Sequence, residues 1–493
     1  FDRLLKEIHK REMRLVLDLV VNHTSDEHPW FEEARKSRHN PYYNYYHWWP
    51  AEEGEPPLRL SYFDEEGNAW TYNKPTDSYY LHYFSRKQPD LNWENPEVRQ
   101  EIFDMMRFWF DKGIDGFRMD SISLIAKDPS FPLIDSKKYP DIFSFYAKEP
   151  RLHLYLHEMN RQVLSKYDCM SVGEGSAVMV DDVAKFVDPA REELNMLYHF
   201  DAARIRNTTL PDNPESGIDY SLIALKKMFT EWDKAVDKGW PSIYLGNHDQ
   251  PRMVSRFGSD KDEFRALSAK MLITFLLTMR GTPYWFAGDE IGMRNIRFDR
   301  IEDYNDIDTI NRYKKAKAEG KDPQAVLDEQ KETGRDNART PFQWDRSPEA
   351  GFTAGTPWLK VNPDYTWINV ADEEKDPTSI LNYFKKVVSF RKENPSLIYG
   401  SYHLLDAENP QSYTFLRKTG ADTYLIMLNF SPKAAISTPG IDMSNAHVLL
   451  DNYGARSHMA PQKDITLRPF EAIVFQLNHP VYESFIDSLD LLE

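Results

Sequence analysis

Short apolar runs recur along the chain, and several of them end on an acidic residue or a histidine. Residues 14–22 form an almost uninterrupted apolar run with Asp18 inside it, which predicts a fully buried strand of a parallel sheet, with Asp18 in buried hydrogen bonds. Similar runs predict further strands near residues 116, 169, 194, 242 and 283. Six parallel strands are therefore expected.

Segments with helical periodicity lie between these runs. Asn95 and Pro96 have the residue types of a helix N-cap and first turn, and they open a predicted helix at 96–112. Further helices are expected at 153–166, 220–236, 264–279 and 379–394. Regular β/α alternation is typical of a (β/α)8 TIM barrel, which needs eight strands. We therefore expect about two N-terminal β/α units of the barrel to precede Phe1.

Two segments break the alternation. Residues 24–95 are irregular and rich in Pro, Tyr and Trp, too long for a plain loop, and predict an inserted subdomain. After Pro395 the apolar period changes to two, which predicts a C-terminal antiparallel β-sandwich. The expected layout is a barrel at 1–23 and 96–396, the insertion at 24–95, the β domain at 397–478 and an acidic tail at 479–493.

Composition argues against several classes of partner and of chemistry. The net charge of −17 argues against nucleic acid or an anionic membrane as a partner, and no apolar run approaches the length of a membrane helix. Cys169 is the only cysteine, so no internal disulfide can form, and we expect a buried, inert thiol. No metal-ligand spacing occurs, so no metal or other cofactor is expected in this chain. The oligomeric state stays open.

Three carboxylates follow predicted strands: Asp120, Glu174 and Asp249. A parallel barrel carries its chemistry at the carboxyl ends of its strands, so these groups should share one rim. His23 ends a fourth run in the same way. Several carboxylates at one rim favour acid/base and nucleophilic cleavage of a glycosidic bond. The 14% aromatic content, partly in polar context, suits binding of sugar rings.

Neighbouring residues fit this chemistry. Arg118 lies two residues before Asp120 and should keep it ionised. Gly173, before Glu174, should let substrate or backbone approach, and Glu174 could stay protonated if it is desolvated. Asp249 follows His248 and could hold sugar hydroxyls.

The ordered motifs resemble those of glycoside hydrolase family 13, the α-amylase family, in its oligo-1,6-glucosidase/α-glucosidase branch. Four motifs carry the resemblance at barrel-like spacing, and two more are similar to those of the branch. These are Asp18–His23, Gly116–Asp120, Gly173–Glu174 and Asn247–Asp249, with Gln88–Asn92 and Arg335–Trp344 for the branch.

The resemblance implies a retaining α-glucosidase acting on short oligosaccharides or disaccharides through a glucosyl-enzyme intermediate, which can also transfer glucose to another sugar. Asp120 would be the nucleophile, Glu174 the acid/base and Asp249 the stabiliser of the transition state. The expected substrate-binding residues are His23, Arg118, His248, Arg339 and Ser121. The family's calcium site would lie in the N-terminal segment expected before Phe1.

Specificity is open at this stage. In the branch, Val after the nucleophile accompanies α-1,6 linkages and Thr or Ala accompanies α-1,4; Ser121 is neither, but its small side chain favours α-1,4 or broad specificity. A sucrose isomerase is one alternative, although the segment aligned with its Arg-rich loop, 204–208, keeps only the first Arg. A trehalose-6-phosphate hydrolase and a non-catalytic relative are the others. The intact carboxylates argue against the last.

Overall fold

The structure is a computed structural model that describes residues 1–63, 68–135, 137–138, 142–208, 220–420, 422–441, 443, 446–454 and 463–477. The predicted tail at 479–493, and the side chains of 204 and 206–208, lie outside the described residues. The chain forms two compact units, which are described separately. The first comprises residues 1–200 and 235–241, and the second residues 201–234 and 242–493.

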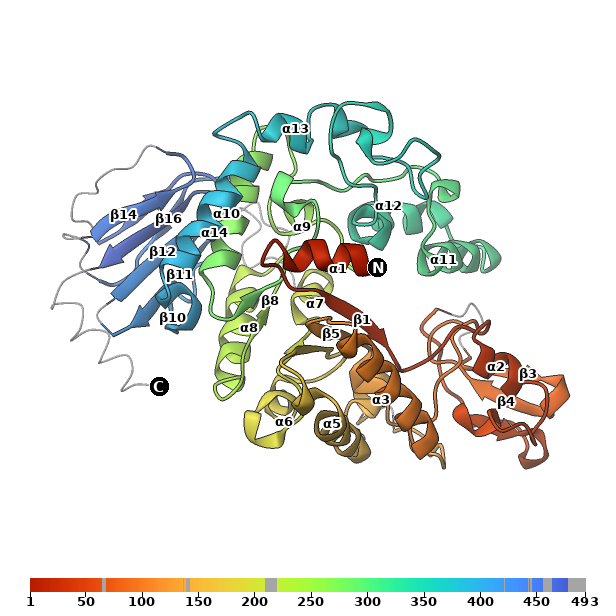
Figure 1. Ribbon diagram of the computed structural model, residues 1–493. Helices are drawn as coiled ribbons and strands as arrows, with labels where there is room; N and C mark the ends of the chain where they lie inside the picture. The colour runs from red at the N-terminus through yellow and green to blue at the C-terminus, as the bar shows by residue number, and fades with distance from the viewer. Residues whose placement is uncertain are drawn as a thin grey trace. The chain divides into compact units, whose positions relative to one another are not determined.

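The first unit is built on a parallel sheet. Its strands follow one another in the order β1-β5-β6-β7, and the first two are labelled in Figure 1. They are β1 (Val16–Val20), β5 (Gly116–Asp120), β6 (Met170–Glu174) and β7 (Met196–Tyr198). In the second unit, β8 (Ser242–Ile243) pairs in parallel with β9 (Thr282–Pro283). The six predicted parallel strands are therefore confirmed.

Gly116 lets β5 and β6 approach closely. A Cβ atom at Gly116 would lie 2.2 Å from the carbonyl oxygen of Met170 on β6. No side chain fits at that distance, so glycine is required where β5 begins. On the other side of β5, the register with β1 pairs Asp18 with Arg118.

The helices of the first unit match the predicted pattern, with shifted ends. The Asn95 side chain accepts a hydrogen bond from the Glu97 amide, and Pro96 is the first residue of α3, as the sequence predicts. The helix expected at 153–166 begins earlier, at Pro150. The helices are α1 (Asp2–His9), α2 (Pro29–Ala34), α3 (Pro96–Asp111), α4 (Ile142–Tyr146), α5 (Pro150–Gln162) and α6 (Ala184–Val187).

The prediction of a fully buried first strand was wrong. Only Leu19 of β1 is buried, and Val20 is 46% exposed. Within the described residues β1 pairs with β5 alone, so its other edge has no strand beside it. Apolar continuity in sequence predicted the strand correctly but not its position in the sheet.

The insertion folds into a small antiparallel sheet with strand order β2-β4-β3. Phe131 packs edge-on against Trp70 of this sheet in a small buried cluster. Its strands are β2 (Trp48–Pro50), β3 (Trp70–Asn73) and β4 (Ser78–Leu81).

The second unit combines helices with an antiparallel C-terminal sheet of order β10-β11-β12-β16-β14 (Figure 1). One apolar core joins this sheet to the β13–β15 pair. The strands are β10 (Ser401–Leu405), β11 (Ser412–Thr419), β12 (Asp422–Asn429), β13 (Ala435–Ser437), β14 (Ala446–Asp451), β15 (Ile465–Leu467) and β16 (Ala472–Leu477). The helices are α7 (Asp201–Thr208), α8 (Leu222–Ala235), α9 (Met253–Phe257), α10 (Arg265–Thr278), α11 (Ile307–Ala318), α12 (Pro323–Thr333), α13 (Val370–Glu373), α14 (Ile380–Glu393) and α15 (Ser396–Tyr399).

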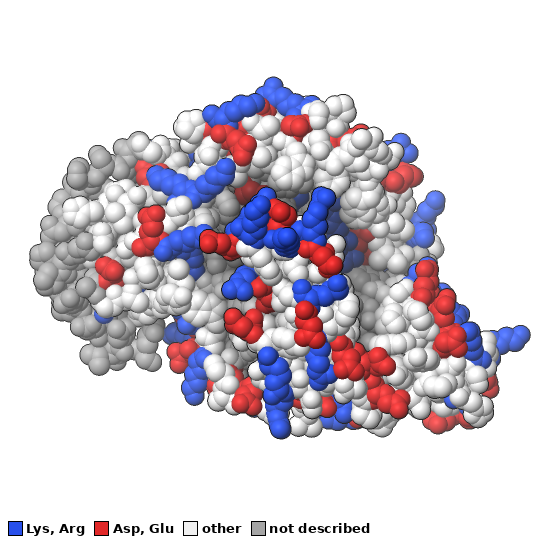
Figure 2. Space-filling model, viewed as in Figure 1, with Lys and Arg blue, Asp and Glu red and all other residues white. Residues whose placement is uncertain are grey.

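Surface charge is mixed. On the face shown in Figure 2, acidic and basic side chains are interspersed. Among the described helices, none has the length and apolar character needed to cross a membrane.

Candidate active site

Arg118 binds the charged groups at the centre of the parallel sheet. Its Nη1 donates to Asp120 Oδ1 at 2.7 Å and to Asp18 Oδ1, on the neighbouring strand β1, at 2.8 Å. Its Nη2 donates to Glu174 Oε2 at the end of β6. One guanidinium therefore holds carboxylates from three adjacent strands. Asp18 was expected in buried hydrogen bonds, but its side chain is 55% exposed, so that prediction was wrong.

Tyr198 completes this cluster from the end of β7. Its hydroxyl accepts from Arg118 Nε at 3.0 Å and donates to Glu174 Oε2 at 3.2 Å. Ser176 Oγ donates to the other oxygen of Glu174 at 2.9 Å. Sequence reasoning missed Tyr198 and Ser176. The position of Tyr198 near the end of a predicted parallel strand was the one feature of the sequence that could have indicated a role at the rim.

Burial differs among the three carboxylates. The side chain of Asp120 is 22% exposed, and that of Glu174 is 9% exposed. Burial of Arg118 opposes its charge, but Tyr198 and the surrounding carboxylates raise its pKa above the ordinary value. Arg118 is therefore a permanent cation that faces three acidic groups.

The backbone turns sharply after Asp120. Ser121 is 3% exposed and has a left-handed conformation with φ of 45°, which directs its N–H to Glu174 Oε2 at 3.4 Å. Gly173 has a different role from the one expected. A Cβ atom there would lie 2.7 Å from Leu194 Cδ1 and 2.9 Å from Ile122 Cγ2, so the close approach it permits is that of core side chains.

His23 follows β1 and is 7% exposed. Its Nδ1 lies 3.2 Å from Asn22 Nδ2, and its Nε2 lies 3.0 Å from Gln88 Nε2. Phe84 packs edge-on against the ring, with centroids 5.2 Å apart. Burial lowers the pKa of His23, which favours the neutral imidazole.

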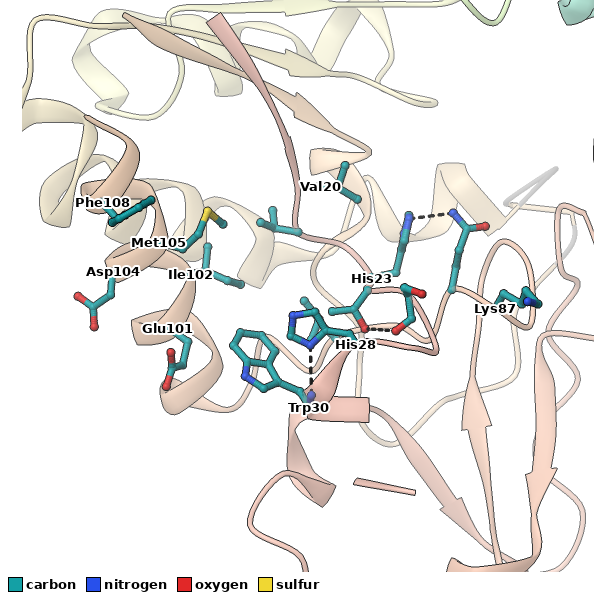
Figure 3. A pocket seen from close by; sticks show the side chains of 15 residues that line it. Val20, His23, His28, Trp30, Lys87, Glu101, Ile102, Asp104, Met105 and Phe108 are labelled. Atoms are coloured by element: carbon teal, nitrogen blue, oxygen red, sulfur yellow. Dashed lines mark hydrogen bonds between the residues drawn. The ribbon is translucent and has the colours of Figure 1, made fainter. Parts of the chain in front are cut away.

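His23 and Gln88 line a pocket of about 780 Å³ (Figure 3). The opposite wall comes from α3, including Met105 and Phe108. Asp120 and Glu174 are not among its lining residues, so we place the chemistry at the Arg118 cluster.

The Gln88–Asn92 motif braces the insertion against the end of β1. The Leu91 amide donates to the Asn22 carbonyl at 3.0 Å, and the Thr24 amide donates to the Pro89 carbonyl at 3.1 Å.

The second unit presents a separate carboxylate held by two arginines. Asp249 Oδ1 accepts from Arg339 Nη2 at 2.9 Å and from Arg335 Nη1 at 3.1 Å. Arg339 Nε also donates to the His248 carbonyl at 2.7 Å, and His248 Nε2 lies 3.3 Å from Asp249 Oδ2. The structure thus brings together the three site residues predicted in this unit.

Arg335 and Asp306 were missed by sequence reasoning. Arg335 Nη2 donates to Asp306 Oδ1, whose side chain is 2% exposed. Burial of Arg335 opposes its charge, but Asp306 and Asp249 raise its pKa. The sequence does give an indication of Arg335, because this residue is the first of the Arg335–Trp344 motif, which also contains Arg339.

Within the part of the chain that the structure describes, no group of three or more His, Cys, Asp or Glu side chains could hold a metal. Cys169 is half-buried, and burial raises its pKa to about 11, so at neutral pH it is a thiol rather than a nucleophilic thiolate.

Carboxylates at the ends of parallel strands, ordered by guanidinium groups, suit the cleavage of glycosidic bonds, and the comparisons identify the chain as a glycoside hydrolase. A family model described as "Alpha amylase, catalytic domain" matches residues 1–400, and the chain belongs to the α-amylase family. Its fold is that of this family, a TIM barrel with a C-terminal sheet domain.

Relatives match nearly the whole chain. An oligo-1,6-glucosidase of Parageobacillus thermoglucosidasius is 49% identical over 97% of this chain and 85% of its own length. A trehalose-6-phosphate hydrolase of Bacillus subtilis (strain 168) is 40% identical, with the same coverage of both chains. A crystal structure of a MutB mutant in complex with the substrate sucrose has a TM-score of 0.89 and is 38% identical, covering 97% of this chain and 85% of the other.

Proposed function

We propose that the protein is a retaining α-glucosidase that hydrolyses terminal α-glucosidic bonds of short oligosaccharides or disaccharides. The observation that carries the proposal is the guanidinium of Arg118, which binds both Asp120 and Glu174. Retaining glycosidases use two carboxyl groups only about 5–5.5 Å apart. A single guanidinium fork that spans both carboxylates supports such a short separation.

Two steps follow from these roles. Asp120 attacks the anomeric carbon and forms an ester bond as the glycosidic bond breaks, while Glu174 gives its proton to the departing oxygen. Water then gives a proton to Glu174 and its hydroxyl oxygen to the anomeric carbon, which frees Asp120. A second sugar in place of that water gives glucosyl transfer.

The charge balance supports Glu174 as the acid. The cation of Arg118 compensates one of the three carboxylates, so binding a proton relieves the remaining repulsion. Glu174 has the least exposed side chain of the three, at 9%, so burial disfavours its charge most, against the hydrogen bonds it accepts from Arg118, Tyr198 and Ser176. Asp120, which is more exposed and contacts Arg118 through Nη1, is the proposed nucleophile.

The remaining proposed roles concern the sugar. Asp249, held by Arg335 and Arg339, is the proposed stabiliser of the oxocarbenium-like transition state. The proposed substrate-binding residues are His23, Arg118, Ser121, His248 and Arg339.

No cofactor enters the proposed reaction, and no metal is assigned to this chain. The described residues contain six parallel strands, two fewer than a closed (β/α)8 barrel. The proposal therefore includes two further β/α units in the barrel.

The test is hydrolysis of p-nitrophenyl α-glucoside, followed by maltose, isomaltose, sucrose and trehalose with products identified. Asp120→Asn should abolish turnover, because the neutral amide is a poor nucleophile. Asp2→Asn is the control, since Asp2 is an 81% exposed partner of Lys112 and should leave turnover unchanged. Absence of turnover by the unaltered protein, or full activity of Asp120→Asn, would contradict the proposal.

The same panel separates the alternatives. A sucrose isomerase would convert sucrose to an isomeric disaccharide rather than to glucose and fructose. The string Arg297–Arg300 resembles the Arg-rich loop of those enzymes, but Arg297 is bound to Glu332 at 2.7 Å and to Asp260 at 2.7 Å. Preferential hydrolysis of trehalose 6-phosphate would favour the phosphorylated substrate instead.

A further inference from the structure

A buried lysine lies behind His23. Lys127 Nζ donates to Asn22 Oδ1 at 2.6 Å and lies 3.0 Å from Asp90 Oδ2. The side chains of Lys127 and Asp90 are both 0% exposed, and Asn22 is 0% exposed. Burial lowers the pKa of Lys127, and the adjacent Asp90 carboxylate opposes that effect and stabilises the ammonium form.

This contact determines the orientation of the Asn22 amide. An ammonium group can donate but cannot accept, so the atom 2.6 Å from Lys127 must be the amide oxygen. The amide nitrogen of Asn22 then faces His23 Nδ1 at 3.2 Å and donates to it. The orientation of this amide is therefore settled by chemistry, although oxygen and nitrogen have similar shapes.

The orientation of Asn22 in turn determines where His23 carries its proton. A neutral imidazole has one N–H and one acceptor nitrogen. Since Nδ1 accepts from Asn22, the hydrogen must be on Nε2. A doubly protonated ring would direct its Nδ1–H at the Asn22 N–H, and burial also lowers the pKa of His23.

The Gln88 amide also contacts His23, at Nε2, but its orientation is held less strongly than that of Asn22. Its amide nitrogen lies 3.0 Å from His23 Nε2, and one neutral ring cannot accept at both nitrogens. Gln88 is half-buried in the pocket wall and its amide oxygen accepts one neutral hydrogen bond, from the Ser85 amide at 3.1 Å, whereas Asn22 is fully buried and held by a charged donor at 2.6 Å. The Nε2–H is therefore offered to the Gln88 amide oxygen or to a ligand in the pocket (Figure 3).

We propose that Lys127 is a positioning residue that, through Asn22, holds His23 as an Nε2–H donor for a sugar hydroxyl oxygen. The identity of the ligand rests on the proposed function, but the state of the ring does not. The two are therefore tested by separate measurements.

The first measurement is the ¹³Cδ2 chemical shift of His23 in protein labelled with ¹³C-histidine, assigned by loss of the signal in His23→Gln. The unaltered protein should show the neutral Nε2–H form. Asn22→Asp keeps an oxygen for Lys127 but replaces the donor with an acceptor, so Nδ1 should gain a proton. Lys127→Met with Asp90→Asn releases Asn22 without leaving an unpaired buried charge, and the two neutral forms should then mix.

A matched control comes from another ion pair of the same unit. Arg99 Nε donates to Glu158 Oε2 at 2.7 Å, and neither residue contacts His23. Arg99→Met with Glu158→Gln should lower stability but keep the wild-type ring state. An Nδ1–H ring in the unaltered protein, or an unchanged ring in both Asn22→Asp and the Lys127/Asp90 double variant, would overturn the proposal.

The second measurement is kcat/KM on p-nitrophenyl α-glucoside. Asn22→Asp, which moves the proton to Nδ1, should lower kcat/KM about tenfold, the order of one lost hydrogen bond of about 1.4 kcal/mol. Even mixing of the two ring forms in the Lys127/Asp90 double variant should lower it only about twofold, because about half of the molecules keep the Nε2–H form. The Arg99/Glu158 control should stay within about twofold of the unaltered protein. If no sugar is hydrolysed, the proposed function fails, while the chemical shifts still decide the state of His23.

Discussion

Arg118 Nη1 lies 2.7 Å from Asp120 Oδ1, and the two residues are two positions apart on one strand. The alternation of side chains along a strand directs both to one face, so the contact follows from local geometry. The same guanidinium then reaches Glu174 on β6, which only the parallel sheet makes possible.

Arg118→Lys should lower kcat/KM by about a hundredfold or more. A lysine keeps the charge but lacks the planar fork that reaches both Asp120 and Glu174. The measurement is kcat/KM on p-nitrophenyl α-glucoside, with thermal unfolding to verify folding. Arg107→Lys is the control, because Arg107 contacts Asp104 on the surface of α3. Equal losses in both variants would argue against the role of the fork.

Tyr198→Phe should lower kcat/KM about tenfold with little change in stability. The substitution removes the hydroxyl that bridges Arg118 and Glu174. The hydrogen bonds of that hydroxyl contribute about 1–2 kcal/mol. It keeps the ring beside Arg118, whose guanidinium carbon lies 5.6 Å from the ring centroid. Parallel kinetics and thermal unfolding separate the two effects. An unchanged kcat/KM would show that the hydroxyl does not support catalysis.

Ser121→Val should destabilise the protein by about 1–2 kcal/mol, because a β-branched residue is strained in the left-handed conformation that Ser121 adopts. The branch pattern further predicts a higher ratio of isomaltose to maltose hydrolysis. Thermal unfolding and kcat/KM on both disaccharides measure these effects. Ser121→Ala is the control, and an equal change in its ratio would refute a specific effect of Val.

Stability should fall as pH decreases, in part through His47. This side chain is buried, its Nε2 has no hydrogen-bond partner among the described residues, and burial lowers its pKa to about 3. Below about pH 6.5 the unfolded chain binds a proton at this histidine that the folded state does not, so stability is lost as pH falls toward 3. At pH 5 the loss is about 2 kcal/mol.

Urea unfolding at pH 7 and pH 5 measures this dependence. His47→Gln should reduce the difference between the two pH values, and the exposed His39→Gln should leave it unchanged. A pH dependence that His47→Gln does not alter would assign the loss to other groups.

Local patterns were sufficient to predict the strands, the capped helix α3 and the motifs that end the strands. Asn95 binds the amide of Glu97 two residues on. Such features depend on neighbours in the chain, so residue type and spacing are enough to indicate them. The predicted burial of Asp18 was wrong because exposure depends on which elements cover a strand.

The sequence by itself determined the six parallel strands, the order of the acidic motifs and the α-amylase family. Only the tertiary structure decided that Arg118 binds Glu174, 56 positions away, and that Lys127 binds Asn22, 105 positions away. Periodicity shows which face a side chain occupies, but not which distant group it meets there. The hydrogen-bond partners of Arg118 and the proton position on His23 are set by those distant contacts, because hydrogen bonding and burial act only between groups that the fold brings together.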